Sequence, residues 1–182
     1  MFKNTKGVDF CCWNDVPHLI TPVVNFDADA SVKALKWVVS EIDRRLKEHP
    51  SNMPYIVVVI DEIADLMYAY RTETEYCIQK IAQKARAVGI HLIMATQRPD
   101  ALTGIIKANF PTRASFQTRT SQDSNIILGE KGAEHLLPFG DMLFSDAGRV
   151  PVRIHGAFIS DDELTKVGNF LRKQCSPDYV NG

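Results

Sequence analysis

The sequence predicts an α/β fold with a mainly parallel sheet flanked by helices. Two apolar runs, at residues 55–60 and 90–95, lack the alternation of polar and apolar residues that marks a half-exposed strand. A helical pattern over residues 72–89 connects them, with acidic residues in its first turns and a glycine at its end. A strand, helix and strand in this order predict a βαβ unit whose two strands are parallel and buried on both faces.

The composition is typical of a globular protein. The chain has 182 residues, of which 45% are hydrophobic and 24% charged, and its net charge is -1. A net charge near zero neither indicates nor excludes nucleic acid, so any DNA contact must come from local groups. No apolar run approaches the roughly 20 residues of a membrane span. The four cysteines form no CxxC pair, so we expect a reducing, cytoplasmic compartment and no structural metal.

A third apolar stripe, over residues 29–49, has helical spacing and predicts an amphipathic helix. Two prolines follow it within a few residues and stop the helix. The charged residues Arg44, Arg45 and Lys47 are interpreted as its solvated outer face.

The second half of the chain predicts shorter elements. They are a helix at 102–110, a strand at 113–118, a helix at 121–129 capped by Ser121 or Asp123, a hairpin of 141–144 with 150–156, and a helix at 160–173 that begins with the capping box Ser160 and Glu163.

Two adjacent carboxylates, Asp61 and Glu62, follow the strand at 55–60 directly. The carboxyl ends of parallel strands are where α/β sheets place their ligands. In nucleotide hydrolases the first acid of such a pair holds Mg²⁺, and the second orients or deprotonates the attacking water. The alternative is that the pair only caps the helix that follows, as acids at helix starts do.

The end of the next predicted strand favours the nucleotide interpretation. Residues 90–95 are followed by Thr96 and Gln97. If the two strands are neighbours, Gln97 lies beside the carboxylate pair, where its amide can sense the γ-phosphate or position water. The competing interpretation is a polar strand end in solvent.

A phosphate-binding loop is absent from the sequence. No glycine is followed by lysine, so the pattern G-x-x-x-x-G-K-[ST] does not occur. Without such a loop, Mg-ATP finds acids for its metal but no nest of amides for its phosphates. We therefore expect this chain by itself to bind ATP weakly.

The chain resembles the motor domain of the FtsK/SpoIIIE DNA translocases along nearly its whole length. The resemblance rests on seven ordered blocks: VPHLITPVV (16–24), ALKWVVSEIDRR (34–45), VVVIDEIADLM (57–67), IAQKARAVGIHLIMATQRP (81–99), TGIIKANFPTRASFQ (103–117), GAEHLLPFGDMLF (132–144) and RIHGAFISDDE (153–163). It implies a RecA-like P-loop NTPase core that assembles as a homo-hexamer and pumps double-stranded DNA with ATP. It also implies that Asp61 and Glu62 form the Walker B motif, with Asp61 on Mg²⁺ and Glu62 as catalytic base.

The resemblance implies roles for three basic residues. Arg86 is similar in position to the arginine that completes a neighbouring subunit's ATP site. Arg98 and Lys107 are similar to channel-loop residues that touch the DNA backbone, although a solvated surface charge is the alternative for all three. Ser121 and Asn125 stand where the family commonly has basic residues, which weakens the expected DNA contact.

The ends of the chain also have counterparts in the family. By this resemblance, residues 1–174 are a partial motor domain that begins after the Walker A loop, and residues 175–182 are a linker toward a winged-helix module. We therefore expect a fragment that is inactive alone, from a protein that acts in chromosome partition and cell division. Its parent is expected on the cytoplasmic side of the inner membrane, with contact to the membrane only through segments outside these 182 residues.

Two other functions remain open from the sequence. The first is a ring ATPase with a different cargo, since the type VII secretion motors, which are related to the FtsK/SpoIIIE family, move protein instead of DNA. The chain can also be a non-catalytic module that keeps only a ring-forming surface. The segment TGIIKANFPTR, with Lys107, and the preceding Arg98 favour the DNA-pumping function.

Overall fold

The parallel strand pair that the sequence predicts is present in the computed structural model, which describes residues 3–4, 10–25, 27–49 and 52–180. The chain forms two units, residues 1–97 with 160–182 and residues 98–159, and each is described by itself. In the first unit the elements are β1 (Lys3–Asn4), η1 (Cys11–Trp13), β2 (Val24–Asn25), α1 (Ala28–Glu48), β3 (Ile56–Ile60), α2 (Ile63–Ala69), α3 (Arg71–Lys84), η2 (Ala85–Val88), β4 (Ile90–Met94) and α6 (Asp161–Arg172).

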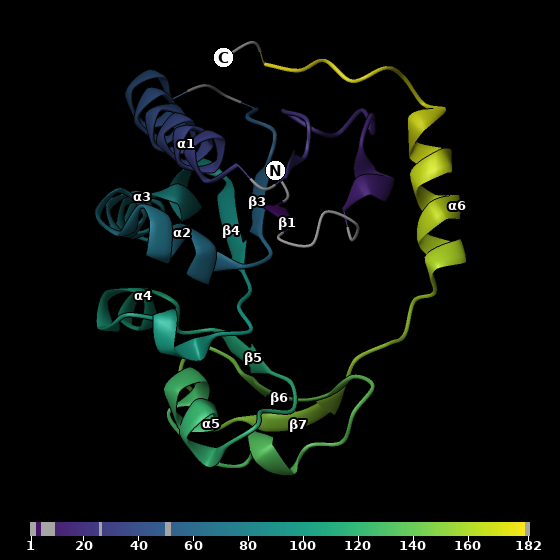
Figure 1. Cartoon of the computed structure of the whole chain (residues 1–182). Helices are drawn as coiled ribbons and strands as arrows, with labels where there is room; N and C mark the ends of the chain where they lie inside the picture. Colours follow the sequence, from purple (N-terminus) through teal and green to yellow (C-terminus); the bar gives the residue numbers. More distant parts are fainter. Residues whose placement is uncertain (1–2, 5–9, 26, 50–51, 181–182) are drawn as a thin grey trace. The chain divides into compact units, whose positions relative to one another are not determined.

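The βαβ unit consists of β3, helices α2 and α3, and β4. The strands β3 and β4 pair in parallel, with Ile56 opposite Ile90 and Ile60 opposite Met94. Figure 1 shows α1, α2 and α3 gathered on one side of this pair. The helical pattern at 72–89 becomes α3 followed by the short 3₁₀ turn η2, and Gly89 ends it in the left-handed conformation, with φ of 70°.

The helix α1 forms where the apolar stripe predicts it. The side chain of Asp27 caps its start by accepting a hydrogen bond from the amide of Ala30. The buried face of the helix includes Val32, Leu35, Val38 and Ile42.

The prediction that β3 and β4 are buried on both faces is wrong for the described residues. Side chains of one face, including Val58 and Ile60, are buried, but Val57 and Ile93 on the other face are 48% and 57% exposed. An unbroken run of β-branched residues suits a strand covered on one face as well as one covered on both. The run therefore predicts the strand but not the number of layers that cover it.

The prediction that Arg45 faces solvent is also wrong. Its side chain is 3% exposed and donates hydrogen bonds to the Glu41 carboxylate and to the backbone carbonyls of Pro54 and Val88. A buried guanidinium is tolerated because each of these acceptors satisfies one of its N–H groups. Arg45 thereby joins α1 to the segments that precede β3 and β4. Its neighbour Arg44 is the exposed residue that the sequence predicts, bonded to Glu41 and Glu48.

The second unit contains a three-stranded antiparallel sheet in the order β5-β6-β7. Its elements are η3 (Pro99–Ala101), α4 (Gly104–Asn109), β5 (Arg113–Ser115), α5 (Ser121–Leu128), η4 (Ala133–His135), β6 (Asp141–Ser145) and β7 (Val152–His155). The predicted hairpin is confirmed as β6 and β7. Neither predicted cap of α5 is correct, because Thr120 is the capping residue: its Oγ1 accepts from the amide of Asp123 at 3.1 Å.

The chain returns to the first unit at Ser160, where the predicted capping box of α6 is confirmed. Arg172 on α6 donates to the carbonyls of Cys12 and Asn14, which ties the helix to η1. The segment after α6 also has a partner, because the amide of Val180 donates to the carbonyl of Ile20 at 2.9 Å. Among the described helices, none combines the length and the apolar character needed to cross a membrane.

Candidate functional site

The carboxyl ends of β3 and β4 stay joined beyond the strands themselves. The amide of Ala95 donates to the carbonyl of Ile60 at 2.8 Å, and the amide of Ile63 donates to the carbonyl of Ala95 at 3.0 Å. Asp61 and Glu62 lie between these two hydrogen bonds, in the connection from β3 to α2. The acid pair is therefore held at the edge of the sheet where parallel strands place their ligands.

The Glu62 side chain turns inward and is only 6% exposed. One carboxylate oxygen, Oε1, accepts from the Thr96 hydroxyl and from the amide of Ala64 at 3.1 Å. The other, Oε2, accepts from the amide of Gln97 at 2.9 Å. Both sequence interpretations describe part of this geometry, because Glu62 is the N-cap of α2 and also contacts the end of β4.

The neighbourhood of Glu62 and Gln97 confirms that β3 and β4 bring these residues together, but the contact differs from the expected one. Gln97 approaches Glu62 through its backbone amide, while the residue as a whole is exposed. Thr96, which the sequence interpretation left without a role, supplies the side-chain contact. The only signal for it is a hydroxyl directly before Gln97 at the end of an apolar strand.

Asp61 is half-buried and precedes Glu62 at the strand end. Within the described part of the chain, no group of three or more His, Cys, Asp or Glu side chains is arranged to hold a metal ion. A single carboxylate such as that of Asp61 fits Mg²⁺ better than zinc or calcium, since Mg²⁺ is usually held by one or two carboxylates together with phosphate oxygens and water. Asp61 is the residue that would hold it.

The three basic residues singled out by the resemblance lie in different places. Arg86 is exposed in η2, which precedes β4, so it lies at the opposite end of that strand from Gln97. Arg98 is the first residue of the second unit, and Lys107 lies in the last turn of α4. Within its own chain, Arg86 therefore does not lie at the acid edge, the edge of the strand pair that carries Asp61 and Glu62.

The segment that carries Lys107 is held by Arg113 of β5. The Arg113 guanidinium donates to the carbonyls of Phe110 at 2.8 Å and Ile127 at 3.0 Å, and also to the carbonyl of Lys107. One side chain thus binds the end of α4 and the end of α5 together. This arrangement fixes the backbone of the last turn of α4, which contains Lys107.

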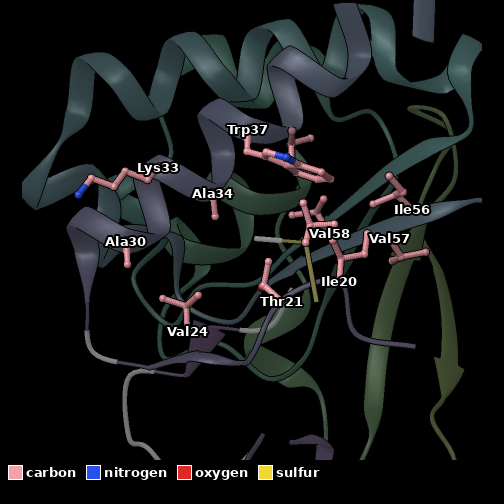
Figure 2. A pocket seen from close by; sticks show the side chains of 12 residues that line it. Ile20, Thr21, Val24, Ala30, Lys33, Ala34, Trp37, Ile56, Val57 and Val58 are labelled. Atoms are coloured by element: carbon pink, nitrogen blue, oxygen red, sulfur yellow. The ribbon is translucent and has the colours of Figure 1, made fainter. Parts of the chain in front are cut away.

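A cavity of about 250 Å³ lies elsewhere, beside the amino-terminal half of β3. Figure 2 shows Trp37 of α1, Val57 and Val58 of β3 and Ile20 around it. Lys33 at its margin is paired with Asp29 at 2.8 Å. The cavity is apolar and is lined by the opposite end of β3 from the acids, so it is not part of the acid edge.

Comparison with known proteins points to one family. Residues 47–101 match the family model described as FtsK/SpoIIIE family. The chain is 45% identical to the DNA translocase SftA of Bacillus subtilis over 96% of its length and 21% of that protein. It is 41% identical to the DNA translocase FtsK of Caulobacter vibrioides over 97% of its length and 27% of that protein. The chain thus spans about a quarter of the length of these relatives.

Solved structures agree with this fold. The chain superposes with a TM-score of 0.78 on the pCW3 conjugation coupling protein TcpA, a monomer form with ATPγS, at 29% identity over 95% of this chain and 55% of that one. The cytoplasmic domain of the type VII secretion ATPase EccC from Thermomonospora curvata also gives 0.78, at 19% identity over 94% of this chain and 24% of that one. One neighbour is described with ATPγS and the other as an ATPase, and the likeness to both confirms the predicted fold class.

Proposed function

This chain belongs to the FtsK/SpoIIIE family, and on that premise we propose that it is the Walker B part of an ATP-driven motor that translocates double-stranded DNA. The observation that carries the proposal is the contact between Glu62 and the end of β4, which gathers Glu62, Thr96 and Gln97 at one edge of a parallel strand pair. Such an edge, with an acid on one strand and a polar residue on the next, suits a nucleotide's γ-phosphate.

In this proposal the two acids have separate roles. Asp61 holds Mg²⁺, which when bound neutralises charge on the phosphates. Glu62 accepts the proton of the attacking water, and the Gln97 side chain, which is exposed, is available to orient that water or to sense the γ-phosphate. The phosphates themselves need a cradle of backbone amides, which the sequence of these 182 residues does not contain.

In the proposed assembly three basic residues contact partners. Arg86 contacts a neighbouring copy of the chain, and Arg98 and Lys107 contact DNA. Arg86 lies at the far end of β4 from Gln97, so it suits the ATP site of a neighbouring copy in a homo-hexamer better than its own. Arg98 and Lys107 contact DNA phosphates, which requires only positive charge and no reading of bases. A motor that runs over any sequence needs contacts of this kind. The proposed setting is chromosome partition during cell division, in the cytoplasm.

The experiment that tests the proposal is Glu62→Gln in the protein that carries this segment together with a phosphate-binding loop. We expect the ATP turnover number to fall by about 10²-fold or more, because a general base contributes about that much, while ATP affinity is retained. Glu75→Gln is the matched control, since Glu75 of α3 pairs with Arg71 at 3.5 Å and has no role in the proposed site. Unchanged turnover in the Glu62 variant would refute the catalytic assignment.

Protein export is the second candidate function, and the likeness to EccC supports it only at the level of the fold. The two functions differ in what stimulates the ATPase. We expect double-stranded DNA to raise ATP hydrolysis and Arg98→Ala with Lys107→Ala to reduce that stimulation. Hydrolysis that is indifferent to DNA but rises with an exported polypeptide would favour protein export.

A further inference from the structure

Three hydrogen-bond donors of this chain surround the Glu62 carboxylate. They are the amides of Ala64 and Gln97 and the hydroxyl of Thr96, and they leave the residue 6% exposed. An ionised carboxylate has about four lone-pair sites, so these contacts occupy most of them. A general base must come within about 2.6–3.2 Å of the water that it deprotonates. In this conformation little of the carboxylate is open to a water molecule.

The three contacts differ in origin. The amide of Ala64 lies two residues along the chain and belongs to the cap of α2, so it moves with Glu62. The contacts from Thr96 and Gln97 come from residues 34 and 35 positions away, at the end of β4. These two alone decide whether the carboxylate is held against the neighbouring strand end.

The two residues at the end of β4 that hold Glu62 are next to the point where the chain passes from the first unit to the second. Gln97 is the last residue of the first unit, and Arg98, which the proposed function assigns to DNA, is the first residue of the second. A displacement of Arg98 therefore reaches Gln97 through a single peptide bond. The same short segment, residues 96–98, contains both the restraint on the acid and a contact for DNA.

We propose that Thr96 is a positioning residue that acts through Glu62. Together with the amide of Gln97 it holds the carboxylate in a resting position, and DNA bound at Arg98 draws the segment away and frees the carboxylate for water. This inference rests on the proposed function, because it requires that Glu62 is the base and that Arg98 meets DNA. It explains in structural terms how DNA would stimulate hydrolysis.

Thr96→Val tests the restraint, because valine keeps the shape of threonine and removes the hydroxyl. In the ATP-hydrolysing protein we expect turnover without DNA to rise at least about threefold. Losing a hydrogen bond to a charged group shifts the equilibrium between the held and the free carboxylate by at least that factor. Turnover with saturating DNA and the KM for ATP should stay unchanged, so the stimulation ratio falls. Thr96→Ser, which keeps the hydroxyl, should restore the low rate without DNA. Equal melting temperatures of the variants exclude a general loss of structure.

Two outcomes of this experiment would overturn the inference. If Thr96→Val lowers the rates with and without DNA together, Thr96 supports the reaction instead of restraining it. If neither rate changes, the hydroxyl has no role in hydrolysis. Neither outcome affects the proposed function, which depends on Glu62→Gln.

A second measurement needs no ATP hydrolysis and uses this chain as it is. The amide proton of Gln97, bonded to a carboxylate, should move upfield in NMR spectra of Glu62→Ala. Addition of a DNA duplex to the wild-type chain should move it in the same direction, and Arg98→Ala should abolish that effect. If duplex DNA shifts the amide of Lys107 but leaves that of Gln97 in place, the release step is wrong. If DNA shifts neither, the proposed DNA contact fails, and the inference fails with it.

Discussion

The carboxylate of Asp141 on β6 is held by the guanidinium of Arg153 on β7, with Oδ1 accepting from Nε at 2.9 Å and Oδ2 from Nη2 at 2.6 Å. The amide of Leu137 donates to the same carboxylate at 2.7 Å. The hydrogen bonds from Arg153, and then that from Leu137, lower the pKa of Asp141 to about 2. Asp141 thus joins the hairpin to the turn that precedes it.

This lowered pKa makes the stability of the protein depend on pH in a defined window. The unfolded chain binds the proton with a pKa of about 3.9, so the contribution of Asp141 is fully present above about pH 4 and is lost as the pH falls toward 2. We expect Asp141→Asn to be less stable than the wild type at pH 7 and the difference to shrink between pH 4 and pH 2. Urea unfolding at a series of pH values measures it.

The exposed loop residue Asp146 provides the control for this prediction. Asp146→Asn should keep the loss of stability that accompanies acidification between pH 4 and pH 2. A difference between Asp141→Asn and the wild type that stays constant over that range would contradict the assigned cause.

Arg45→Met is expected to destabilise the first unit strongly. The substitution leaves the carbonyls of Pro54 and Val88 without the N–H groups that now satisfy them, and it removes one of the two arginine partners of Glu41. Each buried polar group left without a hydrogen bond costs about 1–3 kcal/mol, so we expect the unfolding free energy to fall by a few kcal/mol. Denaturant unfolding followed by circular dichroism measures the change.

The adjacent arginine on the same helix offers a matched control for this change. Arg44 also bonds Glu41, but its side chain is 49% exposed. Arg44→Met should therefore cost much less than Arg45→Met, because exposed pairs contribute little. Equal costs for the two variants would show that the buried contacts of Arg45 do not stabilise the fold.

Gly140→Ala tests the close approach at the end of the hairpin. Gly140 has φ of 100°, and a Cβ there would lie 2.8 Å from the carbonyl oxygen of Gly156. The amide of Gly156 also donates to the carbonyl of Gly140 at 2.7 Å, so neither backbone can easily withdraw. We expect a loss of more than about 1 kcal/mol in unfolding free energy, measured by thermal or denaturant unfolding.

Gly104, the first residue of α4, is the control for the general effect of replacing glycine by alanine, which makes the unfolded chain less flexible. A Cβ on Gly104 would meet no atom within 4 Å. Gly104→Ala should leave stability unchanged or raise it by up to about 1 kcal/mol. If both substitutions have the same effect, the contact with Gly156 does not limit the residue at 140.

Local signals were sufficient to predict most of the elements. The apolar stripe of α1, the capping box Ser160 and Glu163, and the order of β3, α3 and β4 all depend on residues close together in the chain. The same strand order predicted that Glu62 and Gln97 meet at one edge, and the structure confirms their contact.

Features that depend on distant residues were not predicted. The burial of Arg45 depends on the carbonyl of Val88, 43 residues away, and nothing near Arg45 in the sequence indicates it. The contact of Glu62 with the hydroxyl of Thr96 depends on the exact alignment of two strand ends, which periodicity does not give. The exposed face of Val57 and Ile93 depends on which elements cover the sheet, and a strand's own residues do not reveal that.

The two hydrogen bonds made by the backbone of Ala95 set a limit on chain length at the acid edge. Ala95 binds the carbonyl of Ile60 through its amide and the amide of Ile63 through its carbonyl, and two residues fit between these anchors. Neither anchor involves a group of residue 61 or 62, so a substitution at either position removes no donor or acceptor of the anchors. An insertion or deletion of one residue would break at least one anchor and shift the start of α2. At this edge the chemistry is therefore free to change by substitution, whereas the number of residues is not.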